Sequence, residues 1–279
     1  MSPAGSIFLA IAGVVSLALA ILVVRSRLRR RSLTAIESSL VVLPGKDVFD
    51  ASMLEGLPET ARRFFLHAIE EGTPLSSSVF LRQSARMKAD PARPHFELSC
   101  SERLTPGRGF VWRARSGVGP IPIGIFDHYF EGQGSLTVEL LGLFRIAHDA
   151  GADVARSARG RLAAEALWCP GALLPRANLR WEPVDDEHVK IVQRIDGDEI
   201  AVQLELDGSG KLSGLSMQRH GNEGRSDWGP TPYGFEVLDE ATFSGYTIAS
   251  RLLGGWWYGS ERYKEEDCSE FVIESAEFD

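Results

Sequence analysis

An uncharged apolar run near the N-terminus constrains this chain more than any other feature. The run is Ile7–Val24, with the sequence IFLAIAGVVSLALAILVV. A helix of about eighteen residues, rising about 1.5 Å per residue, is roughly 27 Å long, which is close to the thickness of a bilayer's hydrocarbon core. A buried helix can be equally apolar, but a basic cluster directly after a terminal run favours a membrane span. We therefore predict that Ile7–Val24 crosses a membrane, which makes the membrane the first partner of this chain.

The charges around this run predict its direction. No Lys or Arg precedes it, whereas the positive-inside rule places the basic segment that follows, and the large domain after it, in the cytoplasm. These arginines also lie where they can meet anionic headgroups. The alternative is a cleaved signal peptide and an exported domain, since Ala18 and Ala20 resemble a cleavage site; signal peptides, however, carry their positive charge before the apolar run. The arginines are Arg25, Arg27, Arg29, Arg30 and Arg31.

The rest of the chain is acidic. The net charge of the sequence is −8, and leaving out the five arginines gives −13 for the remainder. A domain of this charge repels phosphate backbones, so we predict no nucleic-acid partner. The three cysteines are odd in number and widely spaced, which argues against a disulfide framework and indicates a reducing compartment. They are Cys100, Cys169 and Cys268, and we interpret them as small apolar residues.

We divide the chain into three parts. Residues 1–32 form a transmembrane anchor with its basic flank, residues 33–56 form a juxtamembrane linker, and residues 57–279 form a single β-rich soluble domain. Pro44 and Gly45 interrupt the linker. The part after the anchor is long enough to bury a sizeable core.

Hydrophobic periodicity predicts a β-rich fold. Residues 57–72 and 152–168 have apolar side chains at helical spacing, whereas most of the remaining chain alternates with a period of two, which is typical of antiparallel strands with one buried face. Ser135–Ala147 and Trp257–Tyr263 are two of about ten predicted strands. Because βαβ alternation is lacking, we predict an α+β fold in which one N-terminal transmembrane helix precedes a curved antiparallel sheet or half-barrel with two or three helices.

Several phrases, taken in order, carry a resemblance to a known family. They are LPETARRFFLHAI, SVFLRQSARMK, GFVWRARSGVGPIPI, DHYFEGQGSLTVELLGLFRIA, RLAAEALWCPGALLP, LRWEPVDD and WGPTPYG, spread over roughly residues 57–255. The chain resembles an uncharacterised bacterial family of membrane-anchored proteins, a domain of unknown function, and RLAAEALWCPGALLP is the most specific phrase. Cys169 departs from the family pattern, which has an aromatic residue there. By shape alone, the order of strands is also similar to lipoprotein-carrier domains, whose curved half-barrels hold acyl chains; neither resemblance implies a reaction.

The predicted helix at 152–168 carries the first candidate ligand-binding residues. Arg161 and Glu165 are four residues apart and share a face, with Trp168 further along that face. If they face the concavity of the sheet, they form a polar pair beside an aromatic wall, which is an arrangement that orients a ligand. The alternative is a structural ion pair, either exposed or tying the helix to the sheet.

Two further tryptophans complete the candidate set. Trp112 belongs to the aromatic residues on one face of a predicted strand, and Trp257 lies in the phrase GGWWYG. Trp256 and Trp257 cannot both face one core from a strand, so one of them is expected at a cavity mouth or at the membrane interface. The alternative is that these aromatic residues fill a β core.

Motifs of known catalytic mechanism are lacking. HExxH and GxSxG do not occur, and Asp127-His128 and His148-Asp149 each present only one side chain per face of a strand. We therefore predict no catalytic residue, no metal site and no cofactor, and an enzyme is the least supported class of function.

Two hypotheses for the function remain. The first is a membrane-tethered module that binds a lipid or another apolar small molecule in its curved sheet, and a concave face fully plugged by its own side chains would contradict it. The second is a structural or interaction module that presents an acidic surface to a protein partner at the membrane, without a small-molecule ligand.

Overall fold

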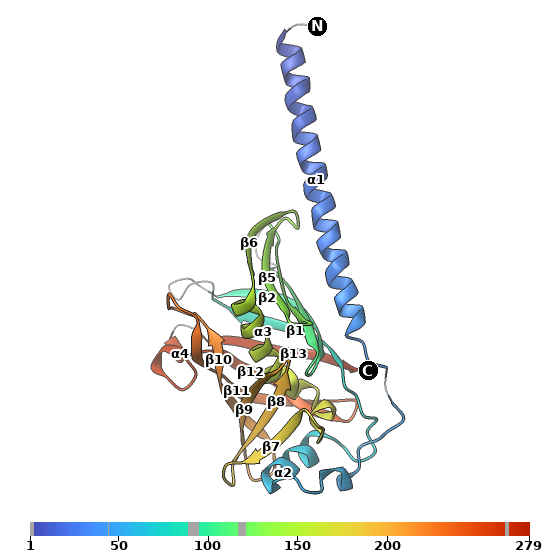
Figure 1. Ribbon diagram of the computed structural model, residues 1–279, viewed down its shortest axis with the longest axis vertical. Helices are drawn as coiled ribbons and strands as arrows, with labels where there is room; N and C mark the ends of the chain where they lie inside the picture. Colours follow the sequence, from blue (N-terminus) through green and yellow to red (C-terminus); the bar gives the residue numbers. More distant parts are fainter. Residues whose placement is uncertain (1–2, 44, 89–94, 117–120, 266–267) are drawn as a thin grey trace.

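The N-terminal apolar run belongs to one long helix, α1 (Pro3–Ser39), which projects from the rest of the protein (Figure 1). The computed structural model describes residues 3–43, 45–88, 95–116, 121–265 and 268–279. Within these ranges one helix is long and apolar enough to cross a membrane, over Ile11–Ser39. Its length, composition and position suit a membrane anchor or a signal sequence, and they do not determine a side of the membrane.

The described strands form one antiparallel sheet of thirteen strands, in the order β6-β5-β4-β3-β2-β1-β13-β12-β11-β10-β9-β8-β7. The sheet has two halves that each follow chain order, and the C-terminal strand β13 joins them by pairing with β1. The strands are β1 (Val79–Met87), β2 (Phe96–Thr105), β3 (Gly109–Ser116), β4 (Ile123–Phe130), β5 (Gln133–Leu140), β6 (Phe144–Ala150), β7 (Leu179–Pro183), β8 (His188–Ile195), β9 (Asp198–Leu206), β10 (Leu212–Gly221), β11 (Gly229–Phe243), β12 (Tyr246–Trp256) and β13 (Ser269–Phe278).

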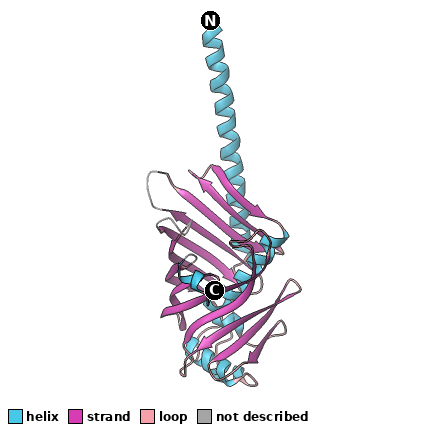
Figure 2. Ribbon diagram, turned by 90° about the vertical axis from the view of Figure 1, so that its left-hand side faces the viewer, coloured by secondary structure: helices cyan, strands magenta, loops and turns pink. Residues whose placement is uncertain are grey.

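The sheet curls into a half-barrel around a helix, which confirms the predicted fold class (Figure 2). Helix α3 (Ala152–Glu165) lies on the concave side and contacts both β5 and β10. Gly134 in β5 permits this packing, because a Cβ there would lie 2.8 Å from the Cα of Ala155. Helix α2 (Glu59–Ala68) packs against β7, β8 and β12, and the short helix α4 (Glu261–Glu265) precedes β13. The described residues also form three short 3₁₀ helices: Ala51–Leu54, Ala166–Trp168 and Pro170–Leu173.

The C-terminal part of α1 packs on the convex side of the half-barrel. Arg29 donates to the Glu139 carboxylate at 2.6 Å, and Arg30 lies 3.7 Å from the same carboxylate, which is almost fully buried. Ser26 Oγ donates to the carbonyl oxygen of Gly142 at 2.7 Å. Two of the five arginines in the basic flank therefore fix α1 to the domain, a role that the charge pattern did not predict.

Two predicted strands are wrong. The segment Ser135–Ala147 is two strands rather than one, because the chain reverses at Leu141 and Gly142, whose φ angles are 55° and 66°. The segment Trp257–Tyr263 is a turn followed by the start of α4, and Trp257 has a φ of 63°, which no strand accommodates. A strand count of about ten was therefore too low.

The segment between α1 and α2 packs against the domain. Leu40, Phe49 and Leu54 are fully buried, and the backbone N–H of Phe49 donates to the carbonyl oxygen of Thr73. The helix α1 also continues to Ser39 without a break. The boundaries of the anchor, linker and domain at residues 32 and 56 stay predictions.

Candidate binding site in the half-barrel

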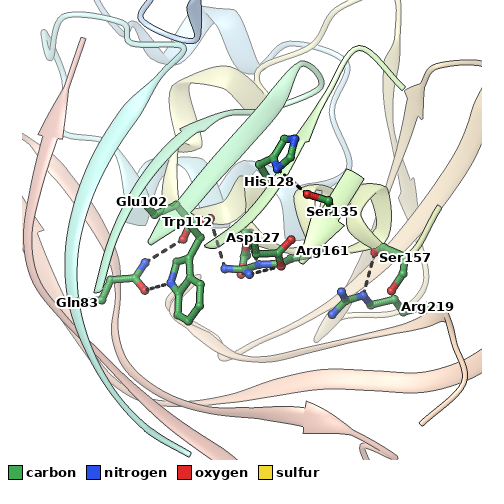
Figure 3. A network of polar contacts seen from close by, with 10 residues as sticks. Gln83, Glu102, Trp112, Asp127, His128, Ser135, Ser157, Arg161 and Arg219 are labelled. Atoms are coloured by element: carbon green, nitrogen blue, oxygen red, sulfur yellow. Dashed lines mark hydrogen bonds and ion pairs between the residues drawn. The ribbon is translucent and has the colours of Figure 1, made fainter. Parts of the chain in front are cut away.

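A buried polar cluster crosses the concave face of the half-barrel at the level of α3 (Figure 3). Arg161 is its centre. Its guanidinium donates to Glu165 at 2.8 Å and to Asp127 at 2.8 Å, and it lies 3.6 Å from Glu102. Three elements therefore meet at one guanidinium group: α3 supplies the cation and one carboxylate, and β4 and β2 supply one carboxylate each. We call these four residues the Arg161 cluster.

The strand register explains why these side chains meet. Glu102 pairs with Trp112, and Trp112 pairs with Asp127, so the three neighbouring residues of β2, β3 and β4 point to the same face. Arg161 and Glu165 are one helical turn apart on the face of α3 that packs on these strands. Strand alternation and helical periodicity therefore put these side chains on one face of the sheet and one face of α3, and the packing of α3 on the sheet brings them together.

Neighbouring groups complete the hydrogen bonds of the cluster. Gln83 Nε2 donates to Glu102 at 3.0 Å, and the indole N–H of Trp112 donates to Gln83 Oε1 at 3.3 Å. The Arg161 guanidinium lies 4.7 Å from the centre of the Phe110 ring and 5.1 Å from that of Trp112. Contact with aromatic faces stabilises a desolvated cation.

Three carboxylates lie near one guanidinium in the cluster, and this environment shifts the pKa values of Glu102, Glu165 and Arg161. Burial, and then the neighbouring Glu165 carboxylate, raise the pKa of Glu102 well above its ordinary value. Burial also raises the pKa of Glu165. Although burial alone would lower the pKa of Arg161, the nearby carboxylates raise it, so the guanidinium keeps its charge. The folded protein therefore binds a proton on Glu102 more tightly than the unfolded chain does.

This shift predicts a pH dependence of folding stability. The ordinary pKa of Glu102 is 4.5, and the folded state binds its proton more tightly, so the free energy of unfolding should fall as the pH rises above 4.5 toward the folded-state pKa. The slope contributed by one proton is at most about 1.4 kcal/mol per pH unit. We expect Glu102→Gln, which keeps the shape and cannot ionise, to flatten this slope in urea unfolding of the full chain. Equal slopes for the wild type and the variant would contradict the assignment.

An apolar surface extends from the Arg161 cluster toward the end of the half-barrel where α1 docks. Its side chains are half-buried, except that Phe144 is 40% exposed. We call this surface the apolar wall. Its members are Met87, Phe96, Ile123, Ile125, Val138, Leu140 and Phe144.

The register places the apolar wall on the same face as the cluster. On β4, Ile125 and Ile123 are two and four residues before Asp127, and they pair with Val138 and Leu140 of β5. Strand β5 then leads to the turn after Leu140, which contacts α1. The wall therefore lies between the polar cluster and the base of the N-terminal apolar helix.

The structure brings three of the five candidate residues together. Arg161, Glu165 and Trp112 belong to the cluster and its immediate contacts. Trp168 lies behind them, 5% exposed, and its indole N–H donates to the carbonyl oxygen of Ala249 at 3.1 Å. It lines a cavity of only about 20 Å³ together with Glu165, which is room for about one water molecule.

Trp257 lies apart from the other four candidates. It occupies the turn after β12, and the guanidinium of Arg262 lies 4.8 Å from the centre of its ring. Its neighbour Trp256 instead packs edge-on against Tyr233 of β11. The two adjacent tryptophans thus face different surroundings, but neither reaches the Arg161 cluster.

A second concavity opens where β9 and β10 separate. The register between these strands runs from Leu212 and Leu206 to Ser216 and Gln203, and a groove of about 980 Å³ lies beyond it, beside α3. Arg219 lies in this groove with its guanidinium 4.6 Å from the rings of both Tyr233 and Trp256. Since charged and polar side chains form much of its lining, this groove suits an apolar chain less well than the apolar wall does.

Two of the histidines, His128 and His148, lie on the convex face of the sheet. They approach Ser135 Oγ at 3.2 Å and Thr137 Oγ1 at 2.9 Å. Across the described parts of the chain, His, Cys, Asp and Glu side chains form no group of three or more that would hold a metal ion. The polar chemistry of the site is therefore that of the Arg161 cluster.

The fold and site define a class of protein in which one N-terminal apolar helix precedes a half-barrel of thirteen described strands that curls around a helix with a mostly buried arginine. Over residues 47–264 the sequence matches the model of DUF6544, a family of unknown function, and the chain belongs to this family. The predicted resemblance to an uncharacterised family is thus confirmed. Among curated proteins, none matches the sequence significantly.

Two solved structures have similar folds. One is a LolA superfamily protein from Nitrosomonas europaea, with a TM-score of 0.42 and 11% identity over 84% of this chain and 94% of that chain. The other is a DUF1329 family protein from Desulfovibrio piger, with a TM-score of 0.39 and 8% identity over 73% of this chain and 86% of that chain. Both TM-scores are below 0.5, so neither likeness indicates what this chain binds.

Proposed function

We propose that this protein binds an apolar chain, such as the acyl chain of a lipid, against the apolar wall, and that α1 anchors it in the membrane. The observation that carries the proposal is the wall itself. Its side chains stay half-buried on the inner face of a curved sheet, although the sheet is otherwise closely packed around α3. Covering apolar side chains from water is favourable, by about 25 cal/mol per Å².

The Arg161 cluster forms the floor of the proposed site. Below it, α3 and the core side chains fill the concave face, so a ligand would occupy only the part between the cluster and the α1 end. Arg161, Glu165 and Trp112 then limit how far an apolar chain enters. Trp168 and Trp257, which the sequence also suggested, lie outside this volume.

Native mass spectrometry of the full chain, released from detergent micelles, tests the proposal. We expect an adduct of lipid mass on the wild type. Ile125→Asn should reduce its occupancy about tenfold at limiting lipid, because a polar amide would then face the apolar chain without a partner. Val184→Asn is the matched control, since Val184 is 44% exposed and follows β7, away from the wall.

Two outcomes would contradict this function. One is equal loss of the adduct in both variants, which would assign the lipid to general contact with the surface or with α1. The other is a clean mass for the wild type after incubation with membrane lipids. That result would favour the alternative, an interaction module for a protein partner at the membrane, and cross-linking in membranes would then identify the partner.

A further inference from the structure

Exposed apolar side chains gather at one end of the half-barrel, around the β5–β6 turn. A soluble surface usually carries such residues singly, so a group of them marks a contact surface. One of these residues lies just before β4, one lies in the β5–β6 turn, and two belong to β6. We call the four residues the apolar tip: Ile121 (49% exposed) before β4, Leu141 (48%) in the turn, and Phe144 (40%) and Ile146 (58%) in β6.

Helix α1 places the apolar tip at the level of its own basic flank. Ser26, which donates to Gly142 in the turn, is only two residues beyond Val24, the end of the apolar run. Two residues of a helix rise about 3 Å. If the run spans the hydrocarbon core, the turn therefore lies within the headgroup layer of the membrane.

Ion pairs between α1 and the sheet fix the position of the β5–β6 turn relative to α1. Glu139, in the strand that leads to the turn, accepts from Arg29 and lies close to Arg30, and its side chain is only 2% exposed. Further along α1, Glu37 pairs with Arg113 of β3 at 2.8 Å. Two ion pairs separated by two turns of helix fix the direction of α1 relative to the sheet.

We propose that the apolar tip inserts into the interfacial layer of a bilayer that contains anionic lipids, beside α1. The proposal rests on the membrane anchoring of α1 and extends the proposed function, because it turns the open end of the apolar wall toward the bilayer. An acyl chain would then pass between the bilayer and the wall without crossing water. Arg145 is exposed between Phe144 and Ile146, and such mixed apolar and basic surfaces bind anionic interfaces.

The distribution of side chains along β6 favours a bilayer over a protein strand as the occupant. Strand β6 is an edge strand and is exposed along its whole length, so its backbone is open to pairing. Its large apolar residues, Phe144 and Ile146, however, lie near the turn, whereas His148 and Asp149 lie toward the other end. A partner strand would run along the whole edge, but a bilayer surface contacts only the end nearest the anchor.

Environment-sensitive labels on the full chain test the proposal. In a Cys268→Ser background, Leu141→Cys and Ile146→Cys would each carry an NBD fluorophore, while Cys100 and Cys169 stay buried and unreactive. The protein would be placed in nanodiscs of phosphatidylcholine and phosphatidylglycerol with spin-labelled lipid as a quencher. We expect quenching at both tip positions to be at least about threefold that at Val184→Cys, which is similarly exposed but lies far from the tip.

Two results of the quenching experiment would overturn the proposal. The first is equal quenching at the tip and at Val184. The second is protection of the tip labels that appears only when two chains share a nanodisc, which would favour strand pairing along β6. Because the lipid adduct in mass spectrometry needs Ile125 but no contact of the tip with a bilayer, failure of the proposed function and failure of tip insertion give different results.

Discussion

Replacing Arg161 with methionine should lower the free energy of unfolding by about 3–5 kcal/mol, because it leaves buried carboxylates without their cation. Arg161 holds Glu165 and Asp127 directly and lies next to Glu102, and its own side chain is 13% exposed. A loss of this size is a large part of the 5–15 kcal/mol that typically stabilises a domain. Urea unfolding of the full chain, followed by circular dichroism, measures it.

The matched control is Arg180→Met. Arg180 also pairs with two carboxylates, those of Glu182 and Glu199, but its side chain is 51% exposed. Water already solvates these charges, so the unfolding midpoint should hardly move. Similar losses in the two variants would show that burial does not set the strength of the Arg161 cluster.

A quadruple replacement separates stability from function. Exchanging Arg161, Glu102, Glu165 and Asp127 together for apolar residues removes the charges of the cluster instead of leaving a carboxylate without its cation, and such exchanges are often neutral or stabilising. We expect the quadruple variant to recover most of the stability that Arg161→Met loses. If it folds but no longer carries the lipid adduct, the cluster serves as the floor of the binding site beyond its part in packing.

Strand alternation predicted the fold, and helical spacing predicted that Arg161 and Glu165 share a face. The pattern in β1 places Val79, Leu81 and Ala85 on the buried face, and all three are buried. The same alternation puts Gln83 on that face, and the pattern of β2, with Leu98 and Cys100 inward, does so for Glu102. The sequence thus placed both polar residues on the buried face. A single polar residue among buried apolar positions does not by itself indicate a site, however, and only the structure shows that Arg161 lies beside Glu102.

Other features depend on contacts that no local pattern encodes. The turn after β5 has Leu141 in a left-handed conformation that leucine rarely adopts, so turn chemistry gave no sign of it. The docking of α1 depends on Glu139, which pairs with Arg29. The alternation of β5 predicts the face on which Glu139 lies, but it does not predict that α1 packs there. The arginines of the flank suggested headgroups, and only the tertiary structure shows that Arg29 meets a buried carboxylate.

These features together give the domain a direction. The Arg161 cluster closes the inner end of the concave face, the apolar wall follows it, and the apolar tip lies where α1 leaves the sheet. With the charged cluster at the inner end and apolar side chains at the open end, the concave face suits a position in which its open end meets a membrane surface. Stability and the proposed lipid binding therefore involve different residues of one face, so substitutions can test them separately.

Trp168→Ala should have the second largest effect, a loss of about 3–5 kcal/mol in the free energy of unfolding, because it leaves a large cavity in the core. Trp168 is 5% exposed, packs 6.5 Å from the Phe235 ring, and donates to the carbonyl oxygen of Ala249. Trp168→Phe keeps most of the volume and loses the hydrogen bond, so it should cost only about 1–3 kcal/mol.

Trp228→Ala is the matched control, since Trp228 is 37% exposed and stacks on His220. We expect this variant to unfold near the wild-type midpoint. Because Trp168 lies behind the cluster and outside the apolar wall, Trp168→Phe should keep the full lipid adduct while it lowers stability. A Trp168→Phe variant that folds with wild-type stability but loses the adduct would instead make Trp168 part of the binding site, and would move that site below Arg161 toward the small cavity beside Glu165.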